Sequence, residues 1–140
     1  MLIVAAMMWG SAKMQSPIAI ESHVRIGLML ALGLVALTFS IGGVVAFRAA
    51  RTTVNPTQID RASRVVTGGI YRFSRNPMYV GLTALLASWA VFLAVPLTVI
   101  GPIAFALFLH RFQILPEERV MAEKFGREYL DYKQRVRRWI

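Results

Sequence analysis

Long uncharged apolar runs dominate this chain, with polar segments between them. The clearest run covers residues 26–47 and contains no charged side chain. At about 1.5 Å of rise per residue, a helix of this length crosses a hydrocarbon core about 30 Å thick. The pattern therefore predicts a membrane helix over residues 26–47.

A second uncharged run covers residues 80–109 and is interrupted by Pro96 and by the pair Gly101-Pro102. As one helix it would be about 45 Å long, too long for one comfortable crossing. A break near Pro96 divides it into membrane helices over 79–95 and 97–114, which can form a hairpin.

The amino-terminal residues are also apolar, but the run is short. A membrane helix over residues 1–18 requires Lys13 to extend its ammonium toward the interface. We include it, which gives about four membrane helices.

The distribution of charge supports the hairpin. Of the 16 Lys and Arg residues, six lie between positions 48 and 75 and eight between positions 111 and 138. The positive-inside rule places both groups on the cytoplasmic side. We therefore predict an all-α polytopic membrane protein that forms a single domain over residues 1–140. Both termini would be cytoplasmic, most simply at a bacterial inner membrane.

Composition excludes several other classes of protein. With 56% hydrophobic residues and a mean hydropathy of +0.55, the net charge of +9 indicates topology and contact with membrane lipids, not nucleic-acid binding. Without cysteine, and with His23 and His110 far apart, no metal site is expected. No Gly-rich nucleotide motif follows a strand, so any cofactor would bind between helices and loops.

The segment over residues 116–140 differs from the rest because charges return. Apolar and aromatic residues recur there at helical spacing, with an interruption at Gly126. This predicts an amphipathic cytoplasmic helix that either lies on the lipid head groups or folds back over the linker at 48–78.

The linker carries the first candidate site, where a polar loop runs into a membrane helix. Pro77 suits the first helical turn, whose free N–H groups favour an anion, and Arg75 could bind a carboxylate with two hydrogen bonds. Alternatively, Arg72 and Arg75 anchor the helix to head groups and Tyr79 belongs to an aromatic belt.

Two carboxylates, Glu117 and Glu118, follow Pro116 and form the second candidate site. They could simply cap a helix amino terminus, or they could bind an ammonium group or the hydroxyls of a ribose. The terminal aromatic residues, followed by cations, form a third and weaker candidate.

The order of these motifs resembles a known family. Arg75-Asn76-Pro77-Met78-Tyr79-Val80-Gly81 resembles the Arg-His-Pro-x-Tyr-x-Gly motif of the isoprenylcysteine carboxyl methyltransferases, which are similar to the membrane phospholipid methyltransferases. Glu117-Glu118, the run Phe125-Gly126-x-x-Tyr129-x-x-Tyr132, and the later Val136 and Arg138 also look like that family.

The resemblance implies S-adenosylmethionine as methyl donor and a lipophilic or membrane-embedded acceptor with a carboxylate, a thiol or a lipid head group. The implied cofactor-binding residues are Tyr71, Arg75, Asn76, Pro77, Tyr79, Gly81, Glu117, Glu118, Tyr129 and Tyr132. The implied catalytic residues are Arg75, Glu118 and Arg138. Both sets fall in the cytoplasmic segments 48–78 and 116–140 or at the adjoining helix end.

One position departs from the family pattern, since Asn76 stands where the motif has His. An amide does not titrate near neutral pH, so an acid–base role is lost while hydrogen bonding remains possible. Two alternatives stay open. One is a non-enzymatic membrane scaffold, which this substitution favours. The other is an NADPH-dependent reductase, because the carboxy-terminal architecture is distantly similar to that of the membrane sterol reductases.

Overall fold

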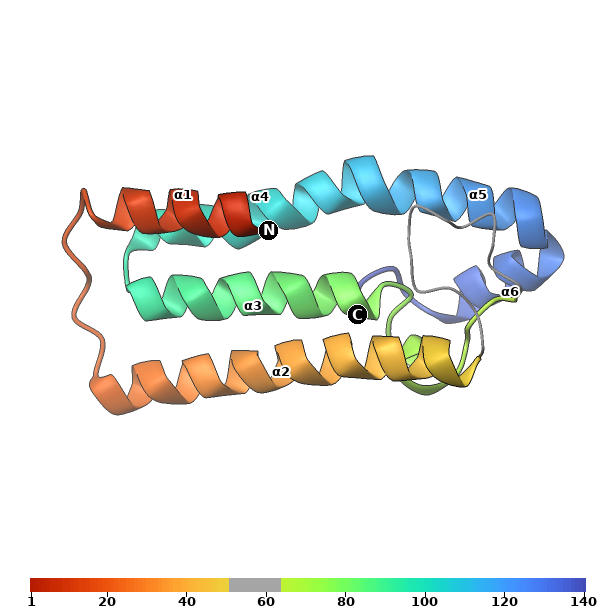
Figure 1. Ribbon diagram of the computed structural model, residues 1–140, viewed down its shortest axis with the longest axis horizontal. Coiled ribbons are helices and arrows are strands. Elements are labelled where there is room, and N and C mark those ends of the chain that lie inside the picture. The colour runs from red at the N-terminus through yellow and green to blue at the C-terminus, as the bar shows by residue number, and fades with distance from the viewer. Residues whose placement is uncertain (51–63) are drawn as a thin grey trace.

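The computed structural model describes residues 1–50 and 64–140, and every regular element among them is helical (Figure 1). Two helices are long and apolar enough to cross a membrane: Ser22–Ala49 (α2) and the continuous helical stretch Pro96–Phe125. Most apolar side chains of α2 are exposed. An exposed apolar helix of this length suits a lipid environment.

Helix α3 (Pro77–Leu93) lies along α2, and small residues set their separation. A Cβ added to Gly81 would meet the Ser40 side chain and would lie 2.8 Å from the Ala36 carbonyl oxygen. A Cβ added to Gly43 would lie 2.6 Å from Met78. The two backbones therefore approach as closely as glycine permits.

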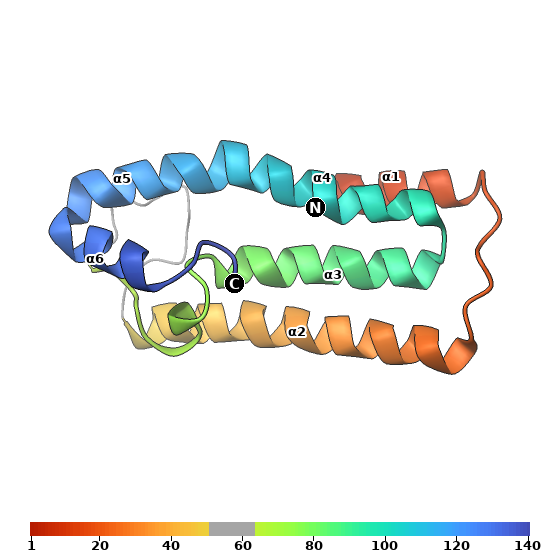
Figure 2. The ribbon, with the colours of Figure 1, turned by 180° about the vertical axis from the view of Figure 1, so that it is seen from behind.

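The predicted break near Pro96 is confirmed. Helix α3 ends at Leu93, and Ala94 takes a left-handed conformation with φ of 53°. A 3₁₀ turn, Pro96–Val99 (η3), then leads into α4 (Ile100–Phe108). Helices α3 and α4 run side by side in opposite directions as a hairpin (Figures 1 and 2).

The predicted end of the last membrane helix at residue 114 is wrong. A π-helical turn, Leu109–Ile114 (η4), follows α4 and continues without a break into α5 (Leu115–Phe125). Pro116 lacks an N–H group, and its ring would clash with the carbonyl four residues earlier in a regular α-helix. The wide turn just before Pro116 relieves that clash, so the helix passes through the proline.

Helix α1 (Leu2–Ala12) is shorter than the predicted 1–18. It stops before Lys13, and an irregular segment containing Pro17 leads to α2. Its 11 residues span about 16 Å, roughly half of a hydrocarbon core. The structure therefore does not confirm four spans.

Residues 64–76 and 127–140 cover one end of the helices, and we call these two segments the polar layer. Helix α6 (Arg127–Arg135) turns back from α5 at Gly126, whose φ is 51°, so the predicted interruption is confirmed. Tyr129 and Tyr132 pack against the 3₁₀ turn Gly69–Arg72 (η2). Of the two placements left open for this segment, α6 folds back over the linker. Residues 51–63 of the predicted linker lie outside the described residues.

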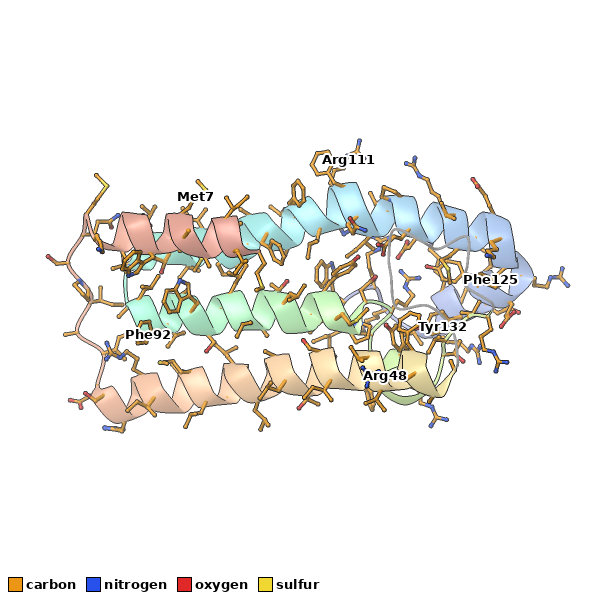
Figure 3. The ribbon with its side chains drawn as sticks, viewed as in Figure 1. Met7, Arg48, Phe92, Arg111, Phe125 and Tyr132 are labelled. Carbon is orange, nitrogen blue, oxygen red and sulfur yellow. The ribbon has the colours of Figure 1, made fainter. Side chains whose placement is uncertain are left out.

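Figure 3 shows the same division of the molecule. Arg48, Phe125 and Tyr132 lie together at the end covered by α6, whereas Phe92 lies near the opposite end. Arg111 points away from the bundle. The candidate residue Tyr132 thus lies at the end of the bundle that α6 covers.

Candidate active site

The site begins in the loop that enters α3. The Asn76 backbone N–H donates to Ser74 Oγ at 3.0 Å, and Asn76 precedes α3 as its N-cap residue. Pro77 occupies the first helical turn, as predicted from the sequence. This turn fixes the direction of Arg75, whose side chain is only 7% exposed.

Arg75 points to Glu118, which is 6% exposed and lies on α5. Arg75 Nη2 is 2.9 Å from Glu118 Oε1, and Nη1 donates to the Lys133 carbonyl at 3.2 Å. Arg75 therefore pairs with a carboxylate of the protein itself, and its predicted contact with a cofactor stays a prediction. Anchoring in the head groups is the wrong interpretation for Arg75, because its side chain is buried.

Arg138 approaches the same carboxylate from the carboxy-terminal tail. Its Nε donates to Glu118 Oε1 at 2.9 Å and its Nη2 to Oε2 at 2.8 Å, a bidentate pair. The hydrogen bond to Glu118 raises the pKa of the Arg138 guanidinium above its ordinary value. Lys133 Nζ lies 3.6 Å from Oε2.

The cluster carries surplus positive charge. Arg75, Arg138 and Lys133 bring three cations to the one carboxylate of Glu118. Among the described residues, Arg75 Nε is buried without a hydrogen-bond partner. A buried donor without a partner costs about 1–3 kcal/mol. Surplus charge and an orphaned donor together suit a bound anionic oxygen.

Glu117 has different surroundings from Glu118. Its Oε1 accepts a hydrogen bond from the Tyr79 hydroxyl at 2.7 Å and another from the Gln113 amide. No ion pair to Glu117 is found within the described part of the chain. Its carboxylate therefore retains acceptor capacity for a cation or for hydroxyl groups.

Buried aromatic residues lie beside the ion-pair cluster around Glu118. The Tyr132 hydroxyl donates to the Tyr71 carbonyl at 2.8 Å, and the Tyr71 ring meets Phe47 edge-on at 5.4 Å. Burial raises the pKa of Tyr132 above its usual range and that of Tyr129 to about 12. Both tyrosines are therefore neutral at physiological pH and pack as structural rings.

The structure does not bring every predicted residue into contact with the cluster. Gly81 faces α2, where its lack of a side chain permits close packing. Pro77 is buried against the same helix near Gly43. Both positions are explained by the α2–α3 contact.

Capping of a helix amino terminus by Glu117 and Glu118 is also wrong, since Pro96–Phe125 is continuous through both residues. The sequence suggested a terminus because a proline precedes two acidic residues, the usual pattern at a helix start. Because both residues lie within a continuous helix, they act through their side-chain contacts and not as helix caps.

Sequence reasoning missed His110 and Gln113, which lie in the π-helical turn. His110 Nε2 is 3.4 Å from Arg138 Nη1, and Gln113 contacts Glu117. The spacing of Gln113 and Glu117, four residues, could have indicated their contact. Nothing in the sequence could have connected His110 with a residue 28 positions later.

This chain is similar in sequence to known proteins, and the matched region contains most of this site. The sequence pattern of the phospholipid methyltransferase family matches residues 23–128. This range includes the α2–α3 pair, the hairpin, Arg75, Glu117 and Glu118, whereas Arg138 lies beyond it.

Similar individual proteins carry related names. The chain is 38% identical over 76 residues to protein-S-isoprenylcysteine O-methyltransferase B of Arabidopsis thaliana, covering 52% of this chain and 37% of that protein. Protein-S-isoprenylcysteine O-methyltransferase of Dictyostelium discoideum is 35% identical over 74 residues, covering 51% of this chain and 30% of that protein. An uncharacterized protein of Haemophilus influenzae is 44% identical over 63 residues, 45% of this chain and its own full length. The match thus spans about a third of each named methyltransferase.

Proposed function

Because this chain belongs to the phospholipid methyltransferase family, we propose that it is an integral-membrane methyltransferase. It would take the methyl group from S-adenosylmethionine and transfer it to a lipophilic acceptor. Residues 1–140 would act as one domain, with the site and both termini on the cytoplasmic side of a bacterial inner membrane. The basic residues at 48–75 and 111–138 support that orientation.

The observation that carries the proposal is the cation cluster around Glu118. Three cations meet one buried carboxylate, and Arg75 retains an unused buried donor. The amino-acid portion of S-adenosylmethionine has a carboxylate that suits these groups. Arg75 and Arg138 would hold it, while Glu118 keeps both guanidinium groups in place.

The second carboxylate would serve another part of the cofactor. Glu117 has no cationic partner among the described residues, and Tyr79 and Gln113 fix one of its oxygens. We assign it to the ammonium group or to the ribose hydroxyls. The sequence left open which of Glu117 and Glu118 meets the ammonium group or the ribose, and their different surroundings support separate roles.

A sulfonium supplies an already activated methyl group, so the protein needs mainly to bind, orient and exclude water. Arg75 and Glu118 are buried and paired with each other, which suits positioning. Tyr71, Tyr129 and Tyr132 are buried beside them and keep that end of the bundle packed. For a carboxylate or thiolate acceptor, the surplus cations would favour the ionised form.

The acceptor would reach the site from the bilayer. The names of the relatives indicate lipophilic acceptors for those proteins, and the helices of this chain expose apolar side chains. A carboxylate, a thiol and a lipid head group all suit the site. Family and relatives favour neither an NADPH-dependent reductase nor a scaffold.

Calorimetry on the purified full chain in detergent tests the cofactor. We expect S-adenosylhomocysteine to bind and NADPH not to bind. Arg75→Ala should weaken binding of S-adenosylhomocysteine by about tenfold or more, since hydrogen bonds to charged groups contribute about 1.5–3 kcal/mol.

Arg72→Ala is the matched control, because Arg72 lies three residues earlier and is exposed. Its affinity should equal that of the unaltered protein. Binding of neither ligand by the unaltered protein would sink the methyltransferase proposal. Equal losses in Arg72→Ala and Arg75→Ala would remove Arg75 from the site.

A further inference from the structure

Arg138 is held at both its main chain and its side chain. Its carbonyl oxygen accepts a hydrogen bond from Asn76 Nδ2 at 3.0 Å, across 62 positions of sequence. The neighbouring Arg137 carbonyl accepts from the Arg75 backbone N–H at 3.0 Å. The tail that follows α6 has no regular secondary structure, so contacts of this kind fix its course.

The side-chain amide of Asn76 is available to bind the Arg138 carbonyl. Asn76 is the N-cap residue of α3, but its side chain makes no capping hydrogen bond. Its own backbone N–H is satisfied by Ser74 Oγ. Its amide is thus used on the Arg138 carbonyl and not on the helix that it precedes.

The guanidinium of Arg138 is held by three partner atoms. Two nitrogens donate to Glu118, and Nη1 lies 3.4 Å from His110 Nε2. Because arginine only donates hydrogen bonds, the imidazole nitrogen must be the acceptor.

The π-helical turn places His110 beside the guanidinium of Arg138. His110 lies in η4, the π-helical turn that accommodates Pro116 in the long helix. Trp139, next to Arg138 in sequence, packs on the apolar cluster formed by residues of α1, α3, α4 and η4. The tail thus joins the polar layer to the apolar bundle at Arg138.

We infer that Asn76 and His110 are positioning residues, which hold Arg138 from its carbonyl and from its guanidinium so that its charge faces the site. The inference rests on the proposed function only in giving Arg138 a ligand to bind. It changes the role assigned to Asn76, which acts through Arg138 and not by touching the cofactor. It also accounts for an amide at the family's His position, since donation alone is required.

The first test needs no cofactor and uses Trp139 as a reporter of the tail. In the 140-residue chain with Trp9→Phe and Trp89→Phe, Trp139 is the remaining tryptophan. Asn76→Ala should shift its emission to longer wavelength and increase quenching by acrylamide. Asn76→His should restore both, because imidazole can donate the same hydrogen bond. Gln134→Ala, which removes an exposed amide on α6, should change neither.

The second test is the affinity for S-adenosylhomocysteine. Asn76→Ala and His110→Leu should each weaken it by about three- to tenfold, the effect of one hydrogen bond. His110→Gln should restore affinity, because an amide oxygen can accept from Nη1. In an Arg138→Ala background, Asn76→Ala should cause no further loss.

The outcomes separate this inference from the proposed function. Unchanged Trp139 emission in Asn76→Ala overturns the positioning role, whatever the cofactor does. A full further loss of affinity from Asn76→Ala in the Arg138→Ala background also overturns it, because Asn76 would then touch the ligand. If the unaltered protein binds no S-adenosylhomocysteine but Trp139 responds as expected, the proposed function fails and the tail arrangement stands.

Discussion

At the scale of single residues, two adjacent carboxylates have opposite surroundings. Glu118 faces the interior with three cations, and Glu117 faces a tyrosine hydroxyl and an amide. Neighbouring positions on a helix point about 100° apart, so adjacent residues meet different partners. The sequence and the family resemblance predicted both carboxylates as cofactor-binding residues and Glu118 also as catalytic, but they did not show what surrounds each side chain.

Glu118→Gln should destabilise the protein strongly. The amide removes the negative charge and leaves the buried Arg75 and the partly exposed Arg138 without their counter-charge. Breaking a buried ion pair costs about 3–5 kcal/mol. We expect the free energy of unfolding to fall by about that amount, seen as a lower Tm by circular dichroism in detergent.

Glu123→Gln supplies the matched control, since Glu123 lies five residues later on α5 and is exposed. It should change the Tm little. If both variants melt together with the unaltered protein, the ion-pair cluster does not stabilise the fold.

At the scale of elements, contact between α2 and α3 depends on glycine. The sequence prediction grouped Gly81 with the cofactor site, but the structure gives it a packing role. Gly81→Ala should lower the free energy of unfolding by about 1–3 kcal/mol through overpacking against Ser40 and Ala36. Thermal melting would show this, with little change in affinity for S-adenosylhomocysteine once the protein is folded.

Gly33→Ala is the comparison for this prediction. Gly33 also lies in α2, and a Cβ there meets no atom within 4 Å. Its stability should stay the same or rise by up to about 1 kcal/mol, because alanine favours helix. Equal melting of the Gly33 and Gly81 variants would contradict the packing role.

The π-helical turn makes a second prediction at this scale. Pro116→Ala restores a backbone donor and a residue that favours helix. The free energy of unfolding should therefore rise by up to about 3 kcal/mol, seen as a higher Tm. A regular helix would then rotate His110 and Gln113 away from their partners. Affinity for S-adenosylhomocysteine should fall although stability increases.

Pro102→Ala tests whether this effect belongs to the wide turn. Pro102 lies in the same long helix, near its start in α4. Its replacement should leave affinity unchanged. A Pro116→Ala protein with a higher Tm and full affinity would show that the wide turn does not position the site.

At the scale of the whole molecule, the polar layer and the segment between α1 and α2 lie at opposite ends (Figures 1 and 2). The chain has no cysteine, so a single introduced thiol reports one side of the membrane. Ser16→Cys should react with a membrane-impermeant maleimide from outside the cell. Arg127→Cys should react only after permeabilisation. Labelling of both thiols from outside would contradict the proposed topology, because the two positions would then not lie on opposite sides of the membrane.

The sequence by itself determined the features that depend on neighbouring residues. Uncharged runs specify apolar helices, Pro96 ends one of them, and Gly126 bends the chain back. The family resemblance was also readable, because its motifs are short and local, and the family match confirms it. Helix ends were less certain, since the sequence shows where a proline stands but not whether a π-helical turn accommodates it.

Tertiary structure alone decided which side chains meet. The contacts of Arg138 with Asn76, His110 and Glu118 join positions 62, 28 and 20 residues apart. Such contacts depend on how the hairpin, α5 and the tail pack together, and no local periodicity encodes that arrangement. Packing thus separated Glu118 from Glu117, gave Gly81 to the α2–α3 contact, and brought His110 to the site.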